Sequence, residues 1–509
     1  MRYIITTLLL LILNSADAQT KKTVTTLEVP GKFEYARIDE KGVSVLPSGR
    51  YISPAGEMIR ITHDPFGMRV SPDGTKAITL HNGVITIIDL ATMQPTRVPS
   101  YDGKIISPFS NGSFLGVDFG DNANIVYLSG GDNGAVLVYD IQQMRRLDSI
   151  SLNGKVGDVL FEDSFTSDLL YNSDKKELLV LDRANFRMVR INMQTRQIEA
   201  SIPCGRLPFG LSVSPDKKYA FVANVGMYAY PLIEGMTEQN YDSLLIPHHP
   251  YGDNTKESIN GTVIDGKKIP GVGSPASPEA MSVFVIDLAT NKVLSKLKTG
   301  HQIGELIEDI EVVGGASPNS IAVGKQLAYI TNATNDNISV IDYRTQKIVK
   351  HIPIKVSPLL DKYRGLLPFG ITLSKDEKKL YVALLGFNAV AVVDIASEKT
   401  LGLIPTGWGP SRVMLGKQDK EIYIITARGL GAGPNGGIGY KKPVQGTFVS
   451  DLQLGSFHKV PVPDSVQLAK YTATTLSNTF AQRQVEINQN PLPPLPGIVT
   501  GKQIGRAHV

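Results

Sequence analysis

The 509-residue sequence contains a single cysteine, Cys204, so the chain cannot form an internal disulfide. No His/Asp relay lies beside Cys204 in the sequence, and we expect a small structural residue rather than a nucleophile. The sequence also lacks a Cys-x-x-Cys-His motif for haem attachment. The formal net charge is only +4 and no run of Lys or Arg stands out, so no nucleic-acid partner is predicted.

The N-terminal apolar run is too short to cross a membrane. Residues 4–13 provide about ten apolar positions, whereas a spanning helix needs roughly twenty. The positive start at Arg2 and the small residues Ala16 and Ala18 are typical of a secretory signal peptide over residues 1–18. We therefore expect an exported bacterial protein, periplasmic or extracellular and without a membrane anchor. A spanning helix is the less favoured alternative.

The sequence is rich in one repeating pattern. Residues 366–400 show it most clearly, with a Pro-Phe-Gly turn, two alternating apolar and polar runs, and an apolar run that ends in Asp. Alternation with a period of two predicts β-strands. The same start recurs at Pro65 and Pro208, and more faintly at Ser317. About seven units at a spacing of roughly 40 to 50 residues predict an all-β fold, a seven-bladed β-propeller, over residues 19–463.

Three segments depart from the repeat. A strand at residues 23–29 precedes the first unit, and we expect it to close the ring by pairing with the last blade near residues 447–462. Residues 42–55 are expected to form an irregular hairpin that leads into the first blade. Residues 226–279 interrupt one blade and are rich in Tyr, Pro and Gly. Loops of this length are uncommon, and aromatic content argues against disorder. We expect this insertion to cover one face of the propeller.

Candidate ligand-binding residues lie in the insertion and in a glycine-rich loop of the last blade. His248 and His249, with Asp253 nearby, invite a metal hypothesis, but they lack clustered ligand spacing, and polar loop residues are the favoured interpretation. In the glycine-rich loop, Arg428 and Asn435 could hold an anion or a carboxylate, although the loop lacks the Gly-Lys-Ser/Thr of a nucleotide site. We predict no catalytic residue, no metal site and no cofactor in this chain.

An aspartate recurs at the end of one apolar strand in each of several repeats. Because it occupies one position of the repeat, it is expected to cap a turn by accepting backbone hydrogen bonds rather than to act in catalysis. The members of this set are Asp89, Asp140, Asp287, Asp342 and Asp394. Trp408, the only tryptophan, is expected to pack rather than to stack on a ligand.

Two strand sequences resemble the signature of a known repeat family. Residues 329–332 (YITN) and 221–224 (FVAN) resemble the YVTN, or YncE-like, β-propeller repeat, whereas residues 381–384 (YVAL) depart from it at the last position. Residues 46–56 (LPSGRYISPAG), the insertion and residues 427–435 (ARGLGAGPN) resemble one subgroup. In that subgroup an exported propeller precedes a phosphoesterase domain of the alkaline-phosphatase superfamily. The resemblance implies a metal-dependent hydrolase whose catalytic domain would follow the propeller.

The C-terminal segment, residues 464–503, is predicted to hold an amphipathic helix over residues 464–485 and a stiff Pro-rich linker at 490–496. The last six residues, 504–509 (IGRAHV), back-translate as ATC GGA AGA GCA CAC GTC, which resembles a common sequencing-library adapter. We expect these residues not to be biological and the reading frame to be truncated before the catalytic domain. A natural short tail is the alternative.

Two classes of function remain open. In the first, the chain is a monomeric, non-catalytic binding or scaffolding module of a larger phosphoesterase, with an unknown ligand or partner domain on the insertion face. In the alternative, it is a stand-alone hydrolase of lactonase type, with a channel metal held by inward carboxylates from several blades. The blade starts at Pro65, Pro208 and Pro368 offer no carboxylate in the turn itself, which favours the first class.

Overall fold

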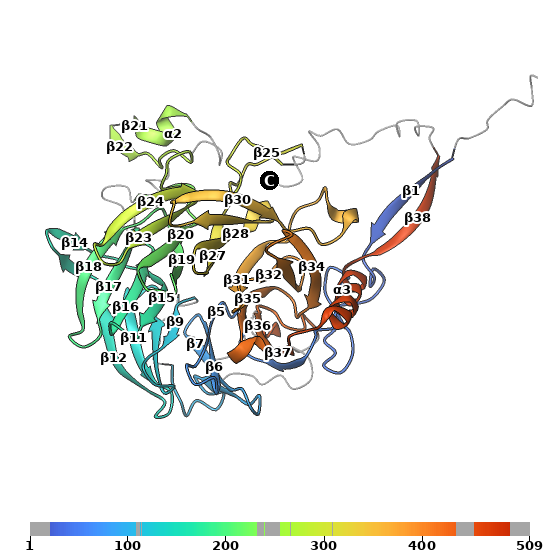
Figure 1. Cartoon of the computed structure of the whole chain (residues 1–509), viewed down its shortest axis with the longest axis horizontal. Coiled ribbons are helices and arrows are strands. Elements are labelled where there is room, and N and C mark those ends of the chain that lie inside the picture. Colours follow the sequence, from blue (N-terminus) through green and yellow to red (C-terminus); the bar gives the residue numbers. More distant parts are fainter. Residues whose placement is uncertain are drawn as a thin grey trace, which may run out of the picture.

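The fold is a seven-bladed β-propeller, as predicted from the repeat (Figure 1). The structure, a computed structural model, describes residues 21–107, 112, 115–231, 239, 255–264, 266–307, 309–433 and 452–488. Seven four-stranded antiparallel sheets surround a central axis, and the first strands of successive blades contact one another around the ring. These seven first strands, β5, β9, β15, β19, β27, β31 and β35, are called the inner strands below.

The blades are numbered 1 to 7 in chain order, each with its inner strand first. They are blade 1, β5 (Gly67–Val70), β6 (Lys76–His81), β7 (Val84–Asp89) and β8 (Pro95–Val98); blade 2, β9 (Val117–Phe119), β10 (Ile125–Ser129), β11 (Ala135–Asp140) and β12 (Arg145–Ser151); blade 3, β15 (Thr166–Asn172), β16 (Glu177–Asp182), β17 (Arg187–Asn192) and β18 (Gln197–Pro203); blade 4, β19 (Pro208–Val213), β20 (Tyr219–Asn224), β23 (Ser282–Asp287) and β24 (Lys292–Lys298); blade 5, β27 (Pro318–Val323), β28 (Leu327–Asn332), β29 (Asn337–Asp342) and β30 (Lys347–Pro353); blade 6, β31 (Pro368–Leu373), β32 (Lys379–Leu384), β33 (Ala389–Asp394) and β34 (Lys399–Pro405); and blade 7, β35 (Pro410–Leu415), β36 (Glu421–Thr426), β37 (Ser456–Pro461) and β4 (Glu57–Arg60).

Smaller elements connect or decorate the blades. They are the hairpins β2 (Ser44–Val45) with β3 (Tyr51–Ile52), β13 (Gly154–Val156) with β14 (Val159–Phe161), β21 (Gly261–Ile264) with β22 (Lys267–Pro270), and β25 (Leu306–Ile307) with β26 (Ile310–Glu311); the ribbon β1 (Lys21–Glu28) with β38 (Ala481–Asn488); the helices α2 (Lys256–Asn260) and α3 (Ser465–Thr479); and the 3-10 turns η2 (Ala333–Asn335), η3 (Pro358–Leu360) and η4 (Lys417–Asp419). The hairpin β2–β3 lies within residues 42–55, where an irregular hairpin was predicted. None of the described helices is long and apolar enough to span a membrane.

An N-terminal strand closes the ring, but it is not the strand that the sequence indicated. β4 is the outermost strand of blade 7, where it pairs antiparallel with β37. The prediction that residues 23–29 would close the ring is wrong, because they belong to β1, which pairs with β38 outside the blades (Figure 1). Only a short connection separates β4 from β5, so closure by β4 joins blade 7 directly to blade 1.

The C-terminal helix is shorter than predicted. α3 begins after Asp464, whose carboxylate accepts a hydrogen bond from Gln467 N (2.7 Å), an N-cap arrangement. The helix ends at Thr479, and the residues that were predicted to continue it form β38, since pairing with β1 satisfies their backbone groups. α3 packs on β34, where a Cβ at Gly402 would lie only 2.6 Å from Leu468 Cγ. Glycine therefore lets the helix approach the sheet.

The hydrophobic core is distributed between the blades. Seven clusters of buried apolar side chains each join two neighbouring blades, and the cluster between blades 7 and 1 closes the series. Alternating residues of each strand face the two neighbouring blades, which explains the period of two in the sequence. Buried Cys204 belongs to the cluster between blades 3 and 4, and burial raises the pKa of its thiol, so its nucleophilic thiolate is disfavoured.

The recurring aspartates cap turns, as predicted. Asp89 Oδ1 accepts hydrogen bonds from Ala91 N (3.0 Å) and Thr92 N (2.8 Å), and Asp394 Oδ1 accepts one from Ser397 N (2.8 Å). Asp140, Asp287 and Asp342 make the same contacts in their blades. This repeated position is structural.

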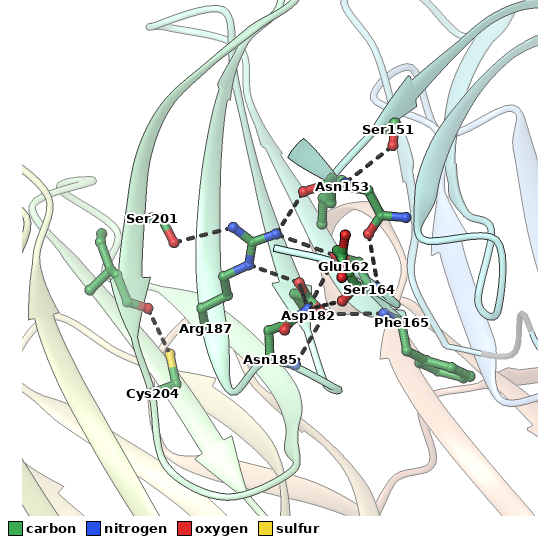
Figure 2. A network of polar contacts seen from close by, with 12 residues as sticks. Ser151, Asn153, Glu162, Ser164, Phe165, Asp182, Asn185, Arg187, Ser201 and Cys204 are labelled. Atoms are coloured by element: carbon green, nitrogen blue, oxygen red, sulfur yellow. Dashed lines mark hydrogen bonds and ion pairs between the residues drawn. The ribbon is translucent and has the colours of Figure 1, made fainter. Parts of the chain in front are cut away.

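A buried ion pair fixes blade 3 against the end of blade 2 (Figure 2). Arg187 is 1% exposed and Asp182 is fully buried, and Arg187 Nε donates to Asp182 Oδ2 at 2.8 Å. Arg187 Nη2 also donates to Leu152 O at 2.7 Å, and the guanidinium carbon lies 3.5 Å from the centre of the Phe161 ring. Asp182 accepts further hydrogen bonds from Phe165 N and from the side chain of Asn185. The pair is therefore a structural anchor.

The insertion separates β20 from β23, yet these strands pair directly in blade 4. Arg206 fixes the base of the insertion, since its Nη1 donates to Met227 O (2.6 Å) and Ser274 O (2.9 Å). In the view of Figure 1, α2, β21 and β22 lie at the periphery of the ring, beyond β23 and β24. The described part of the insertion therefore does not lie over the centre of the propeller in this view.

Candidate functional site in the central channel

Three phenylalanine rings meet at one end of the central channel. They come from the Pro-Phe-Gly motifs of blades 1, 4 and 6. The ring centres of Phe66 and Phe369 are 5.6 Å apart, and those of Phe209 and Phe369 are 5.8 Å apart, both pairs in edge-on arrangements. Since these blades are not neighbours, the contacts must cross the channel axis. The three rings therefore narrow this end of the channel.

The other residues of the motif tie each of these blades to its neighbour. In blades 7, 3 and 5, the residue at the Phe position is polar and donates to the proline carbonyl of the next blade. The bonds are Ser411 Oγ to Pro65 O (2.6 Å), Ser167 Oγ to Pro208 O (3.0 Å) and Asn319 Nδ2 to Pro368 O (3.1 Å). Glycine is required in the motif because the neighbouring inner strand packs against it, and a Cβ at Gly210 would lie 2.0 Å from Asn319 O.

Beyond the rings, a cavity of about 390 Å³ is lined by residues of all seven inner strands. Five of the lining residues carry charge, and four of them lie on inner strands: Arg69 on β5, Asp118 on β9, Asp168 on β15 and Arg412 on β35. Lys217, in the turn after β19, lines the cavity away from the rings. The two arginines and the two aspartates of the inner strands have no net charge when all four are ionised. We call these four residues the channel cluster.

Asp118 bridges two blades. Its Oδ1 lies 3.6 Å from Arg69 Nε, and its Oδ2 accepts a hydrogen bond from Tyr171 N in blade 3 (2.9 Å). Oδ1 also accepts a hydrogen bond from Phe119 N (2.9 Å). The pKa of the Asp118 carboxyl is raised, chiefly by burial, and Arg69 and the two backbone donors offset only part of that rise.

Asp168 repeats this arrangement between blades 3 and 4. Its Oδ2 accepts a hydrogen bond from Leu211 N (3.0 Å), and its Oδ1 accepts one from Leu169 N (2.9 Å). Burial raises the pKa of the Asp168 carboxyl, and the charges of Arg412 and Arg69 oppose that shift. Each aspartate thus has both oxygens engaged by backbone N–H groups.

Arg412 is different, because it has no hydrogen-bond partner among the described residues. Its Nε is buried and unpaired, and it forms no ion pair within 4.0 Å with another described residue. Burial lowers the pKa of its guanidinium, and the charge of Asp168 opposes this. A guanidinium carries five donors and stays ionised in proteins, so Arg412 brings unused donors to the cavity wall.

The donor set does not favour a metal ion. Within the described ranges, no group of three or more His, Cys, Asp or Glu side chains could hold one. The two carboxylates that face the channel already accept backbone hydrogen bonds, and two guanidinium groups beside them would repel a cation. The same charges could hold an anionic or zwitterionic molecule.

The residues predicted from the sequence do not belong to the channel cluster. Arg428 Nε lies 3.5 Å from Asp64 Oδ1, and its guanidinium carbon is 5.4 Å from the centre of the Trp408 ring. The carboxylate near Arg428 is thus one of the chain's own. His248, His249, Asp253 and Asn435 lie outside the described residues, as do the signal peptide, the Pro-rich linker and the last six residues.

No protein-family model matches the chain, and no curated protein matches it. Among solved structures, the chain is similar to the Kuenenia stuttgartiensis hydrazine synthase, with 16% sequence identity and a TM-score of 0.47. The match covers 72% of this chain and 94% of the other.

Proposed function

We propose that this chain is an exported, YVTN/YncE-like propeller that acts as a non-catalytic binding or scaffolding module, and that it is the N-terminal part of a larger phosphoesterase. The observation that supports a binding role is the charge arrangement of the channel cluster. Asp118 and Asp168 are each held by two backbone N–H groups, while Arg412 leaves its donors unused. This arrangement suits recognition of a molecule rather than activation of water.

The ribbon β1–β38 supports a scaffolding role. It extends away from the ring and pairs the N-terminal segment of the propeller with the segment that follows α3 (Figure 1). A domain attached beyond residue 488 would therefore be connected through a paired strand rather than through a single flexible chain. The exported location and the phosphoesterase association rest on the sequence resemblance and the N-terminal segment.

A second candidate is a stand-alone hydrolase of lactonase type. The observation that favours it is that two carboxylates, Asp118 and Asp168, line one cavity. A catalytic zinc commonly has three protein ligands, and calcium takes six to eight oxygens. The backbone hydrogen bonds to both carboxylates and the proximity of Arg69 make this the weaker candidate.

Metal analysis combined with hydrolysis assays tests the binding role. The purified chain, dialysed and then assayed against lactone, ester and phosphoester substrates, is expected to retain no stoichiometric divalent metal and to hydrolyse none of them. The second candidate would be established instead if the chain retained one metal per molecule and hydrolysed a substrate, and if Asp118→Asn and Asp168→Asn each lost both the metal and the hydrolysis.

The phosphoesterase association has its own test. The source DNA should be amplified directly across the codon for Gln503 and sequenced independently. A reading frame that continues into a domain with Asp/His metal-ligand spacing supports the association, whereas a genuine stop codon after Val509 contradicts it.

A further inference from the structure

We propose that the central channel binds a small molecule that carries a carboxylate group, and that Arg412 is the residue that holds this group. This inference rests on the proposed binding role and names its ligand class. Its basis is the channel cluster, the cavity that this cluster lines, and the three phenylalanine rings that narrow one end of the channel.

The guanidinium of Arg412 has hydrogen-bond donors without an acceptor among the described residues. Most buried polar side-chain atoms in proteins have a partner, and a buried donor left without one costs free energy. Arg412 Nε is buried without a partner among the described residues, although the side chain lines the cavity. The opposite charge that acts on it, that of Asp168, uses its oxygens for Leu211 N and Leu169 N. A carboxylate in the cavity would accept hydrogen bonds from the Nη groups of the guanidinium, which have no partner among the described residues, rather than from the enclosed Nε.

Arg69 does not compete for the same role, because it already has a carboxylate. Its Nε lies 3.6 Å from Asp118 Oδ1, so these two charges balance each other. The cation without a short-range anionic partner in the channel cluster is therefore Arg412. An anionic group of a ligand would form a second ion pair in the cavity, with Arg412.

The charges of the channel cluster also select the kind of anion. A guanidinium binds a planar carboxylate through two parallel hydrogen bonds. A doubly charged phosphate or phosphonate would be repelled more strongly by Asp118 and Asp168, which line the same cavity. A monocarboxylate adds one negative charge, and a zwitterion adds none. Both share the carboxylate, and the zwitterion could also place its ammonium near Asp168.

The cavity has the size of a small-molecule site. Its volume of about 390 Å³ lies toward the lower end of ligand pockets, which span roughly 300 to 1,000 Å³. The rings of Phe66, Phe209 and Phe369 narrow one end, so access is from the end where Lys217 lines the cavity. Lys217 would attract an approaching carboxylate. The ligand is therefore a compact molecule rather than a peptide or a polymer.

The test is a ligand-observed NMR titration of the full chain with four probes that share one carbon chain. Butyrate carries the carboxylate, γ-aminobutyrate is the zwitterion, butylamine lacks the carboxylate and butylphosphonate carries up to two negative charges. Butyrate or γ-aminobutyrate should bind, and the tighter of the two identifies the monoanionic or the zwitterionic class. Butylamine should not bind, and butylphosphonate should bind more weakly than either carboxylate.

Variants place the binding at Arg412. Arg412→Met should abolish binding, and Arg412→Lys, which keeps the charge but loses the paired hydrogen bonds, should weaken it by about tenfold or more. Arg344→Met, at an exposed residue in the turn after β29, should bind as the wild type does. Thermal unfolding without ligand shows whether each variant is folded, and Arg412→Lys keeps the test decisive if Arg412→Met fails to fold.

The inference is overturned if no carboxylate binds the wild type, if binding is unchanged in both Arg412 variants, or if the phosphonate binds more tightly than both carboxylates. These failures are distinguishable from failure of the proposed function. The latter appears as metal-dependent hydrolysis by the dialysed or metal-loaded chain, which these titrations do not measure.

Discussion

Replacing Arg187 by methionine should destabilise the propeller by about 3 kcal/mol. Removing one partner of a buried ion pair typically costs about 3 to 5 kcal/mol, because the other charge stays buried without compensation. Arg187 is 1% exposed and Asp182 is fully buried, so this rule applies (Figure 2). Asp182 keeps hydrogen bonds from Phe165 N (3.1 Å) and from Asn185 Nδ2 (2.9 Å), which places the expected loss toward the lower end. Methionine retains much of the apolar stem, so the loss reports charge rather than a cavity.

The assay is unfolding in denaturant, with stability taken from the midpoint and a check that the slope is unchanged. The control is the double variant Arg187→Met with Asp182→Asn, which removes both charges while an amide oxygen can still accept from Phe165 N. Asparagine occupies the corresponding position of blades 4 and 5, as Asn224 and Asn332. The double variant should recover at least about 1 kcal/mol relative to the single variant. A loss below about 1 kcal/mol for Arg187→Met, or no recovery in the double variant, refutes the reasoning.

Three further variants probe the channel end and one half-buried histidine, His81. Ser411→Ala should cost about 1 to 2 kcal/mol in denaturant unfolding, because Pro65 O loses its donor from the neighbouring blade; a cost near zero would show that water replaces the bond. Phe369→Ala should cost about 2 kcal/mol, since both aromatic contacts across the axis depend on this ring, and unchanged stability would contradict that role. Burial lowers the pKa of His81 to about 4 from its ordinary 6.5, so the unfolded chain binds the proton first as the pH falls. His81 therefore contributes stability above pH 6.5 that is lost toward pH 4, and His81→Asn should show a smaller decrease of melting temperature between pH 7 and pH 4.5; an equal decrease would contradict this assignment.

The repeat pattern was sufficient to predict the blades but not how the ring closes. Alternation, the Pro-Phe-Gly starts and the recurring Asp each reflect a local contact that recurs in several blades and has the same physical cause wherever it occurs. Closure depends on which N-terminal strand reaches β37, and both β1 and β4 have strand-like sequences. The partner of β1 is β38, in a segment where the sequence favoured a helix. No local signal distinguishes these pairings, since strand pairing is a long-range choice.

The channel cluster was missed because it departs from the repeat. The blade starts with a clear Pro-Phe-Gly motif place Gly where neighbouring inner strands are close, whereas Asp118, Asp168 and Arg412 lie in blades 2, 3 and 7, which lack the motif, and only Arg69 follows it. Strand pairing places Asp168 and Arg412 at the position of Gly210. For these two residues, a charge at a position where other repeats have glycine was the available signal. Recognising this signal requires knowledge of the register of the inner strands. The weaker repeats do not define that register from sequence alone.

The most direct test of the account is a crystal structure of the chain grown with γ-aminobutyrate or butyrate, whichever binds more tightly. The account predicts one molecule in the channel, with both carboxylate oxygens about 3 Å from guanidinium nitrogens of Arg412. A channel that holds only water while the molecule binds elsewhere, or a metal ion held between Asp118 and Asp168, would contradict the assignment of the channel as a carboxylate site.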